Sequence, residues 1–526
     1  MFPGEPILWA IEAEPEALHC QPPCFLGWLV TARRQSITNM VSRSNSIVWL
    51  LTLIGLLSIQ NGVSQPLSTQ PAARPNFLLI LSDDQTFRAL GCLRDLPVRT
   101  PSLDRLAQRG TLFTHCYNPG GYSGAVCIPS RAMLNTGRRL WECRAPKGEG
   151  LAKNTPLWGE TFRNAGYETF ITGKWHLPDE ALIRSFSTQG FLTPGFLPSS
   201  ANTRGEAYSR PAPGNPWMPD DPKWKGHWIE SEGRFIHSSE RIVSSAIDFL
   251  RSRRSDSSTN FLMYVSLNAP HDPRQAPPEF LKLYPPAQLR PPPNFLPKHP
   301  FPIDGYDIRD EVLAPFPRTP EIVQVHLQEY YAIITHMDRE IGRLLDALES
   351  TGQSRNTVII FTSDQGLAVG QHGLLGKQNL YDHSVRMPFL IAGPGVPRGK
   401  KSGKAIYMQS LYATTCEMAG IPIPPTVQFP SILPIVQGGK APGLESVYGA
   451  YLDKQRSIRE GRWKLIRNAN GIPPQLFEIT SDPWERRNLA GRPSHRARIR
   501  DLDAKLAGLM REWNDPQPAD KFGITP

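Results

Sequence analysis

Several patterns that assign chains to common functional classes are missing from these 526 residues. None of the seven cysteines shows the Cys-x-x-Cys spacing of a structural zinc site. The lysines and arginines are scattered and accompany no zinc-finger or RNP motif, which argues against nucleic acid as a partner. The apolar stretch at residues 47–59 falls short of the about 20 residues that span a membrane, so no stable membrane span is expected. No internal repeat is evident, and with 40% hydrophobic residues the chain is expected to be globular.

Residues 40–64 have the layout of a secretion signal. A basic residue precedes the apolar stretch, and Gly62-Val63-Ser64 places small residues where a signal peptidase cleaves. We therefore expect an exported protein, periplasmic or extracellular, that begins near Gln65. Residues 1–39 show no convincing hydrophobic period and precede this signal, which indicates that the assigned start site lies too far upstream. The alternative is a cytoplasmic segment followed by a membrane anchor.

The bulk composition indicates the size of the domains and the charge of the substrate. A chain of this length suffices for one large α/β domain and a smaller one, because single cores stop growing at roughly 250 to 300 residues. The net charge of +10 suits an anionic substrate. The 53 prolines are about twice the usual share of roughly 5%, which predicts long ordered loops. Two proline-rich stretches, 194–222 and 270–320, are too long for simple connections, so we expect them to roof the functional edge of the fold and to choose the substrate.

Apolar runs alternate with helical patterns along most of the chain. The strands are expected at residues 77–81, 168–172, 261–267, 357–362 and 388–391, and the clearest helical stripe runs from Leu327 to Leu348. This alternation predicts an α/β fold with a mostly parallel sheet covered on both faces. After residue 440 short strands are expected at 457–467 and 475–477, followed by a helix near 496–513. We therefore expect a catalytic domain at 74–440 and a small antiparallel subdomain at 441–526.

Polar residues follow the predicted strands at one edge of the sheet. In chain order they are Asp83 and Asp84, Lys174 and His176, His271, and Asp364 and Gln365. In open α/β sheets, ligands bind at the carboxyl ends of the strands. These residues are therefore expected to meet.

Five cysteines remain in the expected mature chain: Cys92, Cys116, Cys127, Cys143 and Cys416. An odd cysteine in an exported chain is a candidate for chemistry rather than pairing. If Cys127 has that role, the other four can form up to two disulfides of unreadable connectivity.

The segment around Cys127 carries a family resemblance. Cys127-x-Pro129-Ser130-Arg131, followed by Thr136-Gly137-Arg138, resembles the signature of the type I sulfatases of the alkaline-phosphatase superfamily. The resemblance covers residues 74–490, and the pattern around 364–394 is similar to the iduronate-sulfatase-like and choline-sulfatase-like branches. It implies an alkaline-phosphatase-like sandwich with a large, mostly parallel sheet between helices and a small C-terminal antiparallel subdomain.

The resemblance also implies how residue 127 acts. In that family a separate formylglycine-generating enzyme oxidises the cysteine to 3-oxoalanine (formylglycine), whose aldehyde is hydrated to a gem-diol. A serine that attacked a sulfate ester would keep the sulfate as a stable alkyl ester. The second hydroxyl of a gem-diol can lose its proton, expel sulfate and regenerate the aldehyde.

A hard divalent cation is implied by the same family pattern. Asp83, Asp84, Asp364, Gln365 and residue 127 correspond to its metal site. Carboxylate and amide oxygens suit Ca²⁺, or alternatively Mg²⁺, better than zinc or copper. Gln365 departs from the Asn or His that relatives usually have at this position.

The resemblance implies catalytic roles for five cationic or ionisable residues. Arg131 would hold the modified residue, Lys174 and Lys377 would steady the sulfate oxygens, His176 would be a base, and His271 would contact the sulfate near the leaving oxygen. His372 either protonates the leaving alcohol or orders its loop. For a sugar, further candidate contacts are the side chains Arg204, Arg210, Trp217, Trp224 and Trp228, whose alternative role is packing or exposure.

Sulfate ester hydrolysis on a sulfated polysaccharide or oligosaccharide is the function that these observations favour. Two alternatives stay open: a phosphonate or phosphodiester hydrolase of the same superfamily, and an inactive protein that binds sulfated glycans.

Overall fold

The computed structural model describes residues 74–524 except 146–149, 196–206, 213, 216, 225 and 254–258. The predicted signal at 40–64 and the segment 1–39 lie outside the described residues. Among the described helices, none combines the length and the apolar character needed to cross a membrane.

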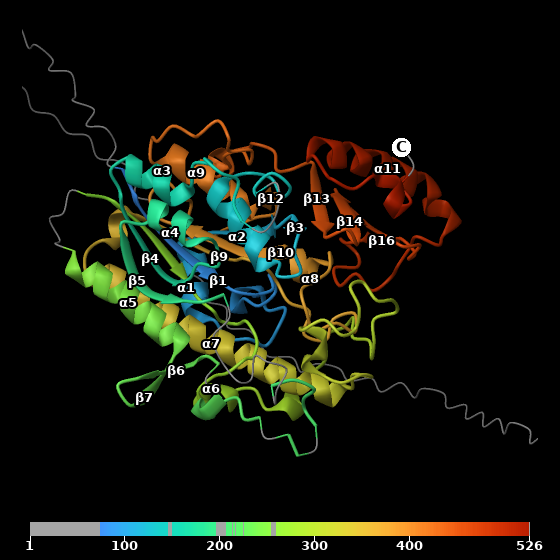
Figure 1. Cartoon of the computed structure of the whole chain (residues 1–526), viewed down its shortest axis with the longest axis horizontal. Helices are drawn as coiled ribbons and strands as arrows, with labels where there is room; N and C mark the ends of the chain where they lie inside the picture. Colours follow the sequence, from blue (N-terminus) through green and yellow to red (C-terminus); the bar gives the residue numbers. More distant parts are fainter. Residues whose placement is uncertain are drawn as a thin grey trace, which may run out of the picture. The chain divides into compact units, whose positions relative to one another are not determined.

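A nine-stranded sheet lies at the centre of the described residues (Figure 1). Its strand order is β11 (Lys400–Ser402), β2 (Gly110–Tyr117), β10 (Arg386–Ala392), β9 (Thr357–Ser363), β1 (Asn76–Ser82), β8 (Phe261–Ser266), β4 (Glu168–Lys174) and β5 (Thr188–Thr193), and β12 (Ile406–Tyr407) also pairs with β2. Most neighbours are parallel, as predicted. The strand expected at 388–391 is an exception, because β10 runs antiparallel to both β2 and β9.

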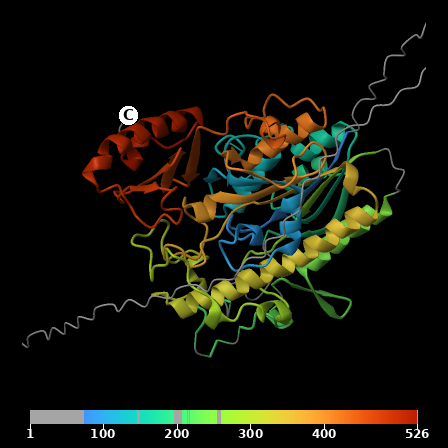
Figure 2. The ribbon, with the colours of Figure 1, turned by 180° about the vertical axis from the view of Figure 1, so that it is seen from behind.

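Helices cover both faces of the sheet, so the central strands are apolar throughout. In β1, Leu78 and Ile80 point into one core, and Phe77, Leu79 and Leu81 point into the other. The first core contains α1 (Pro101–Arg109), α5 (Ser238–Ser252) and α7 (Pro320–Ser350), and the second contains α3 (Trp158–Asn164), α4 (Asp179–Ser185) and α9 (Leu411–Met418). Figures 1 and 2 show α5 and α7 on one side of the sheet and α3, α4 and α9 on the other.

The predicted helical stripe lies on α7. Pro320 occupies the first turn, and the Thr319 side chain accepts a hydrogen bond from the Ile322 amide (3.4 Å), which caps the helix. Leu327, Leu344 and the other predicted stripe residues are buried in the first core. The prediction for this helix is confirmed.

A second, five-stranded sheet lies toward the C-terminus, with the order β16 (Gln475–Glu478), β15 (Trp463–Asn468), β14 (Gln455–Glu460), β13 (Ser446–Tyr451) and β3 (Gly120–Gly121). The segment expected as a strand at 457–467 is a hairpin, because Gly461 at φ 52° turns the chain between β14 and β15. β3 pairs parallel to β13. Gly120 makes this approach possible, since a Cβ there would lie 2.1 Å from the Ala450 carbonyl oxygen.

The remaining elements are short, apart from the last helix. They are α2 (Cys127–Thr136), β6 (Trp228–Ser231), β7 (Arg234–His237), α6 (Pro278–Leu281), α8 (Asp382–Val385), α10 (Leu433–Val436) and the longer α11 (Arg496–Glu512), which agrees with the helix expected near 496–513. The described residues belong to one compact unit, and the boundary at 440 stays a prediction.

The predicted disulfides are absent from the described residues. Cys92, Cys116, Cys127, Cys143 and Cys416 are all free. Except for Cys92, they are buried among apolar side chains or at the sheet edge, where a cysteine packs as a small hydrophobe.

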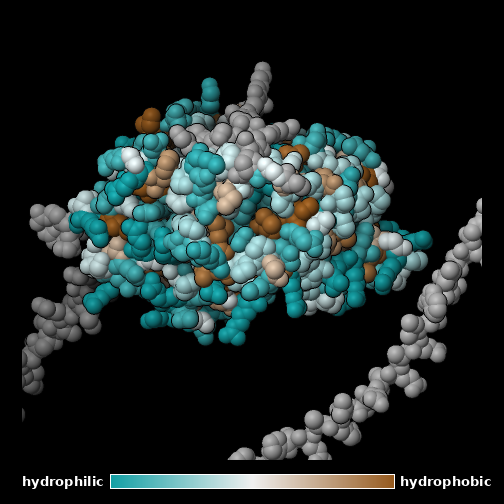
Figure 3. Space-filling view, turned by 90° about the horizontal axis from the view of Figure 1, so that it is seen from below, coloured by the Kyte–Doolittle hydropathy of each residue, from teal (hydrophilic) through white to brown (hydrophobic). Residues whose placement is uncertain are grey.

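On the face shown in Figure 3, hydrophobic residues are scattered among hydrophilic ones.

Candidate active site

The carboxyl ends of β1 and β9 bring the predicted aspartates together. β1 and β9 pair in parallel up to Ser82 and Ser363, so the residues that follow are neighbours. The Asp364 amide donates to the Ser82 carbonyl (3.1 Å), and the Asp84 amide donates to Asp364 Oδ1 (3.3 Å). Asp83, Asp84 and Asp364 are fully buried, which is unusual for carboxylates without a counter-charge.

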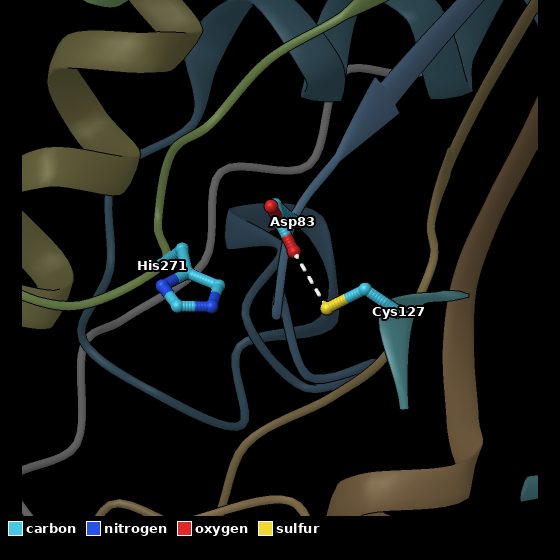
Figure 4. A group of neighbouring side chains, drawn as sticks. All are labelled: Asp83, Cys127 and His271. Atoms are coloured by element: carbon cyan, nitrogen blue, oxygen red, sulfur yellow. Dashed lines mark hydrogen bonds between the residues drawn. The ribbon is translucent and has the colours of Figure 1, made fainter. Parts of the chain in front are cut away.

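Cys127, the first residue of α2, lies against this pair of strand ends. Its Sγ donates a hydrogen bond to Asp83 Oδ1 at 3.4 Å. A dashed line marks this bond in Figure 4. The Lys377 ammonium donates to the same sulfur at 3.1 Å. Burial, followed by the charge of Asp83, raises the pKa of the Cys127 thiol far above its ordinary value. The unmodified side chain is therefore a protonated thiol in this environment.

Arg131 occupies the next turn of α2 and fastens three elements to one another. Its Nε donates to Asp364 Oδ2 (2.9 Å), and its Nη1 donates to the Lys174 carbonyl and to Ser266 Oγ (2.7 Å each). The guanidinium is completely buried and lies 3.9 Å from Asp83. Arg131 thus neutralises the aspartates and orients the start of α2.

Two buried lysines complete the charge balance of the site. Lys174 Nζ donates to Asp83 Oδ2, and Lys377 Nζ donates to both oxygens of Asp84 (2.6 Å each). Burial alone would raise the pKa of Asp83, but the charges of Lys174, His271 and Arg131 hold it well below the ordinary value. Gly173 allows β4 to end at Lys174 in this position, since its φ is 92° and a Cβ would lie 1.8 Å from the Ser266 carbonyl oxygen.

Of the two predicted catalytic histidines, His271 lies against the aspartates and His176 lines a pocket together with Cys127. His271 Nε2 is 3.6 Å from Asp84 Oδ2, and its Nδ1 is 2.7 Å from the Asp272 carbonyl oxygen. Figure 4 shows the His271 ring facing the Asp83 and Cys127 side chains. Burial, together with the charges of Lys174 and Arg131, lowers the pKa of His176 to about 3. His176 is therefore neutral at pH 7.

The donor set fits a hard divalent cation. Ligand atoms of Asp83, Asp84, Cys127 and Asp364 all lie within 4.8 Å of one another. Burial and the neighbouring charges of Asp83 and Asp364 raise the pKa of Asp84, which is the effect expected where carboxylates crowd without a cation. Gln365 is buried beside them, with its Nε2 3.4 Å from the Val126 carbonyl oxygen. Carboxylate and amide oxygens suit Ca²⁺ or Mg²⁺.

His372 lies apart from these residues. Its ring stacks on Tyr381, with centroids 3.9 Å apart and planes 11° apart, and Asn294 Nδ2 donates to its Nε2 (2.9 Å). It is buried and does not line the pocket described below. Of the two roles considered for His372, this geometry favours ordering of the loop.

A pocket of about 370 Å³ opens at Cys127. Lys377 and His176 line it together with Cys127. Further lining residues come from the second proline-rich stretch, the loop after Lys377 and β13: Asp304, Ile308, Arg309, Asp310, Gln378 and Tyr451. The second proline-rich stretch therefore borders the site, as expected. From the first stretch, Gly195 packs on the His176 ring, where a Cβ would lie 2.2 Å from Nε2.

Most of the proposed sugar contacts in the first stretch have a packing role instead. Arg210 pairs with the buried Glu329, and the Trp217 indole donates to Glu329 Oε1 (3.2 Å). Trp217 and Trp224 belong to a small buried core. Trp228 lies on β6 and is half-buried, and Arg204 lies outside the described residues. Packing was the alternative interpretation of these side chains, and the structure supports it for Arg210, Trp217 and Trp224.

Several residues that support the site were not singled out from the sequence. Asn118 Nδ2 and Ser130 Oγ both donate to the Asp364 carbonyl (2.6 and 2.7 Å). Arg309 pairs with Asp272 and Asp310 and so ties the His271 loop to the pocket wall. Ser130 could have been identified from the sequence, since it belongs to the Cys127 motif. The others lie in loops whose position depends on tertiary contacts.

Comparison with known proteins agrees with this geometry. The sulfatase family model matches residues 75–421. The chain belongs to the sulfatase family. A model of the C-terminal part of N-sulphoglucosamine sulphohydrolase matches residues 370–512. As a family member the chain is a sulfuric ester hydrolase, and the function predicted from its motifs is confirmed at that level.

Sulfatases of several specificities are similar along most of the chain. An N-acetylglucosamine-6-O-sulfatase of Bacteroides thetaiotaomicron is 26% identical, over 92% of this chain and 94% of the relative. An ulvan-active sulfatase of Formosa agariphila is 27% identical, over 92% and 90%. A choline-sulfatase of Rhizobium meliloti is 26% identical, over 80% and 83%.

Solved structures confirm the predicted fold class. One, in complex with its substrate D-glucosamine-2-N,6-O-disulfate, superposes with a TM-score of 0.67 at 23% identity and covers 85% of this chain and all of that one. The phosphonate monoester hydrolase of Agrobacterium radiobacter also reaches 0.67, at 22% identity, covering 84% and 96%. The fold is therefore the alkaline-phosphatase-like sandwich with a small, mostly antiparallel second sheet.

Proposed function

We propose that this sulfatase removes sulfate from a sulfated carbohydrate, either a polysaccharide or an oligosaccharide. The observation that carries the proposal is the pocket in which Cys127, Lys377 and His176 line one space with a wall of polar loop residues. A sulfate group can reach residue 127 there while the wall contacts the rest of the molecule. The N-acetylglucosamine-6-O-sulfatase and the ulvan-active sulfatase, both named for carbohydrate substrates, support this substrate class.

The proposed nucleophile is formylglycine, made from Cys127 by a formylglycine-generating enzyme. Its hydrate supplies one hydroxyl that attacks sulfur and a second that lets sulfate leave afterwards. The Cys127 motif supports this conversion. Burial raises the pKa of the unmodified thiol, so the thiol itself would be a weak nucleophile. Arg131 would hold residue 127 through its bonds to Asp364 and to the Lys174 carbonyl.

The charged side chains around residue 127 have distinct proposed roles. Lys174 and Lys377 would contact the sulfate oxygens, because the Lys174 ammonium donates to Asp83 and the Lys377 ammonium donates to the sulfur of residue 127. Neutral His176 would take a proton from residue 127. His271 would contact the sulfate near the leaving oxygen. His372 would order its loop rather than protonate the leaving group.

Asp83, Asp84, Asp364 and Gln365, with residue 127, would hold a Ca²⁺ or Mg²⁺ ion. Such an ion polarises sulfate oxygens when it is bound. The crowding of three buried carboxylates supports this assignment. We further propose that the protein is exported, which rests on the signal-like residues 40–64.

The decisive test combines mass spectrometry and kinetics. In protein from a host with a formylglycine-generating enzyme, the peptide across Cys127 should have the mass of the aldehyde, and the enzyme should release sulfate from 4-nitrophenyl sulfate. The Cys127→Ser variant should fold but show no turnover. A protein with converted residue 127 that prefers a 4-nitrophenyl phosphodiester would be a phosphodiester hydrolase instead. One that binds sulfated glycans without releasing sulfate would be an inactive binding protein.

A further inference from the structure

Residues 486–500 carry a concentrated positive charge. They contain six arginines, Arg486, Arg487, Arg492, Arg496, Arg498 and Arg500, with no lysine and no acidic residue. The expectation that basic residues are scattered along the chain is therefore wrong for this segment. Neighbouring like charges repel one another, so such a cluster is electrostatically unfavourable on a folded surface unless it binds an anion.

The arginines are exposed and mostly unpaired. All six belong to the exposed class, and within the part of the chain that the structure describes only Arg498 forms an ion pair, with Asp501 (3.0 Å). Three of them lie at the start of α11, whose first turn has no acidic residue. Positive charge is unfavourable at this end of a helix, whereas an anion there is stabilised.

The backbone that carries them is firmly held. Just before the cluster, the buried Glu485 accepts a hydrogen bond from the Asp382 amide (2.8 Å) and pairs with Lys464 (2.7 Å). Just after it, α11 buries Leu502 and Leu506 in the core of the second sheet. The arginines therefore project from a fixed surface rather than from a loose tail.

An aromatic ring borders the cluster. Trp463 of β15 is half-buried, and the guanidinium carbons of Arg462 and Arg498 lie 5.5 Å and 6.0 Å from its ring centroid. The centroids of the His495 and Trp463 rings are 5.3 Å apart. A partly exposed aromatic ring beside cations suits a sugar that carries anionic substituents.

We propose that these arginines and Trp463 form an exosite that binds a sulfated polysaccharide outside the catalytic pocket. The proposal rests on the proposed function, which makes such a polymer the substrate. Guanidinium forks match tetrahedral oxyanions better than lysine ammonium groups do, and the cluster contains arginine alone. None of its residues lines the catalytic pocket, so the exosite holds one part of the polysaccharide while a sulfate on another part is hydrolysed at residue 127.

A matched pair of triple variants tests the exosite. The exosite variant is Arg492→Gln/Arg496→Gln/Arg500→Gln. The control, Arg234→Gln/Arg251→Gln/Arg355→Gln, removes three exposed arginines from elsewhere on the surface. Binding to dextran sulfate and to unsulfated dextran is measured at several salt concentrations in a Cys127→Ser background, so that no sulfate is removed. Turnover of 4-nitrophenyl sulfate is measured with Cys127 intact.

The exosite variant should bind dextran sulfate about tenfold more weakly or worse at low salt, and the slope of log affinity against log salt should fall by about three. The control should bind like the parent, dextran should not bind, and both variants should turn over 4-nitrophenyl sulfate like wild type. Equal binding by the exosite and control variants would overturn the exosite, as would tighter parental binding to single-stranded DNA or phosphatidylserine vesicles. If wild-type protein turns over the small ester but ignores dextran sulfate, the exosite fails and the sulfatase function stands. Absence of turnover by converted protein would instead refute the function.

Discussion

Two buried lysines allow catalysis and stability to be separated experimentally. Lys377 is 2% exposed and pairs with Asp84 beside Cys127. Lys464 is 3% exposed and pairs with Asp382 and Glu485, outside the catalytic pocket. Methionine is similar in size to lysine but carries no charge, so each replacement removes one buried cation. Each variant therefore serves as the control for the other.

Both variants are expected to lose stability by a similar amount. Removing one partner of a buried ion pair leaves an uncompensated charge and costs about 3 to 5 kcal/mol. Of these two lysines, only Lys377 contacts residue 127, so only Lys377→Met should lose transition-state stabilisation. We expect kcat to fall by about 10²- to 10³-fold, as it does when other preorganised donors are removed. Loss of stability alone reduces activity only through the folded fraction.

Urea unfolding followed by tryptophan fluorescence gives the stability, and 4-nitrophenyl sulfate gives kcat/KM for the folded fraction. Ca²⁺ should raise the unfolding midpoint of Lys377→Met more than that of Lys464→Met, because Asp84 loses its only close lysine partner in the first variant among the described residues. Equal kcat/KM losses in the two variants after correction for folding would refute the assignment of Lys377 to the sulfate site. So would retention of more than about a tenth of the wild-type value by Lys377→Met.

Three further outcomes follow from histidines. Because burial and the charges of Lys174 and Arg131 lower the pKa of His176 to about 3, kcat/KM should not fall near pH 6.5. A fall of kcat/KM below pH 6.5 in the wild type that is absent in His176→Gln would contradict this lowered pKa. His372→Phe can keep the stack on Tyr381 but loses the bond from Asn294, so it should cost about 1 kcal/mol of stability and leave kcat/KM within about threefold; a hundredfold loss would make it the leaving-group acid. Burial lowers the pKa of His336 to about 3, so the native state binds fewer protons than the unfolded chain and stability falls as the pH drops below 6.5. Urea unfolding at pH 7 and 4.5 should therefore show His336→Phe losing about 2 kcal/mol less than wild type, and equal losses would exclude this effect.

The meeting of the aspartates was predictable because it depends on strand direction alone. Apolar runs that end in Asp83-Asp84 and in Asp364 place all three at one edge if the strands are parallel, and β1 and β9 are. Cys127 was different, since it begins a helix rather than ending a strand. Only the motif around it indicated that its sulfur would face Asp83.

Other features could not be read from the sequence, because they depend on which segments pair or pack with one another. A short apolar run such as 388–391 has the same pattern in either direction, so the antiparallel course of β10 could not be deduced from it. Gly461 interrupts 457–467, but one glycine in a strand pattern indicates a turn only when the flanking segments pair with each other. His372 lies in a glycine-rich segment like those around the catalytic residues, and only the fold shows its ring on Tyr381.

The proposed catalytic groups and the outer wall of the pocket come from different parts of the chain. Apart from Lys377, which lies in the loop after β9, the groups around residue 127 come from strand ends and α2, where the registers of β1, β8 and β9 allow little change without loss of the core. The outer pocket wall, which includes Asp304 and Tyr451, comes from a proline-rich loop and from β13 of the second sheet. Tyr451 donates to Asp304 Oδ2 at 2.6 Å, so the two sources are joined at the wall. Substitutions at this contact can therefore alter which sulfate ester fits while the catalytic groups stay in place.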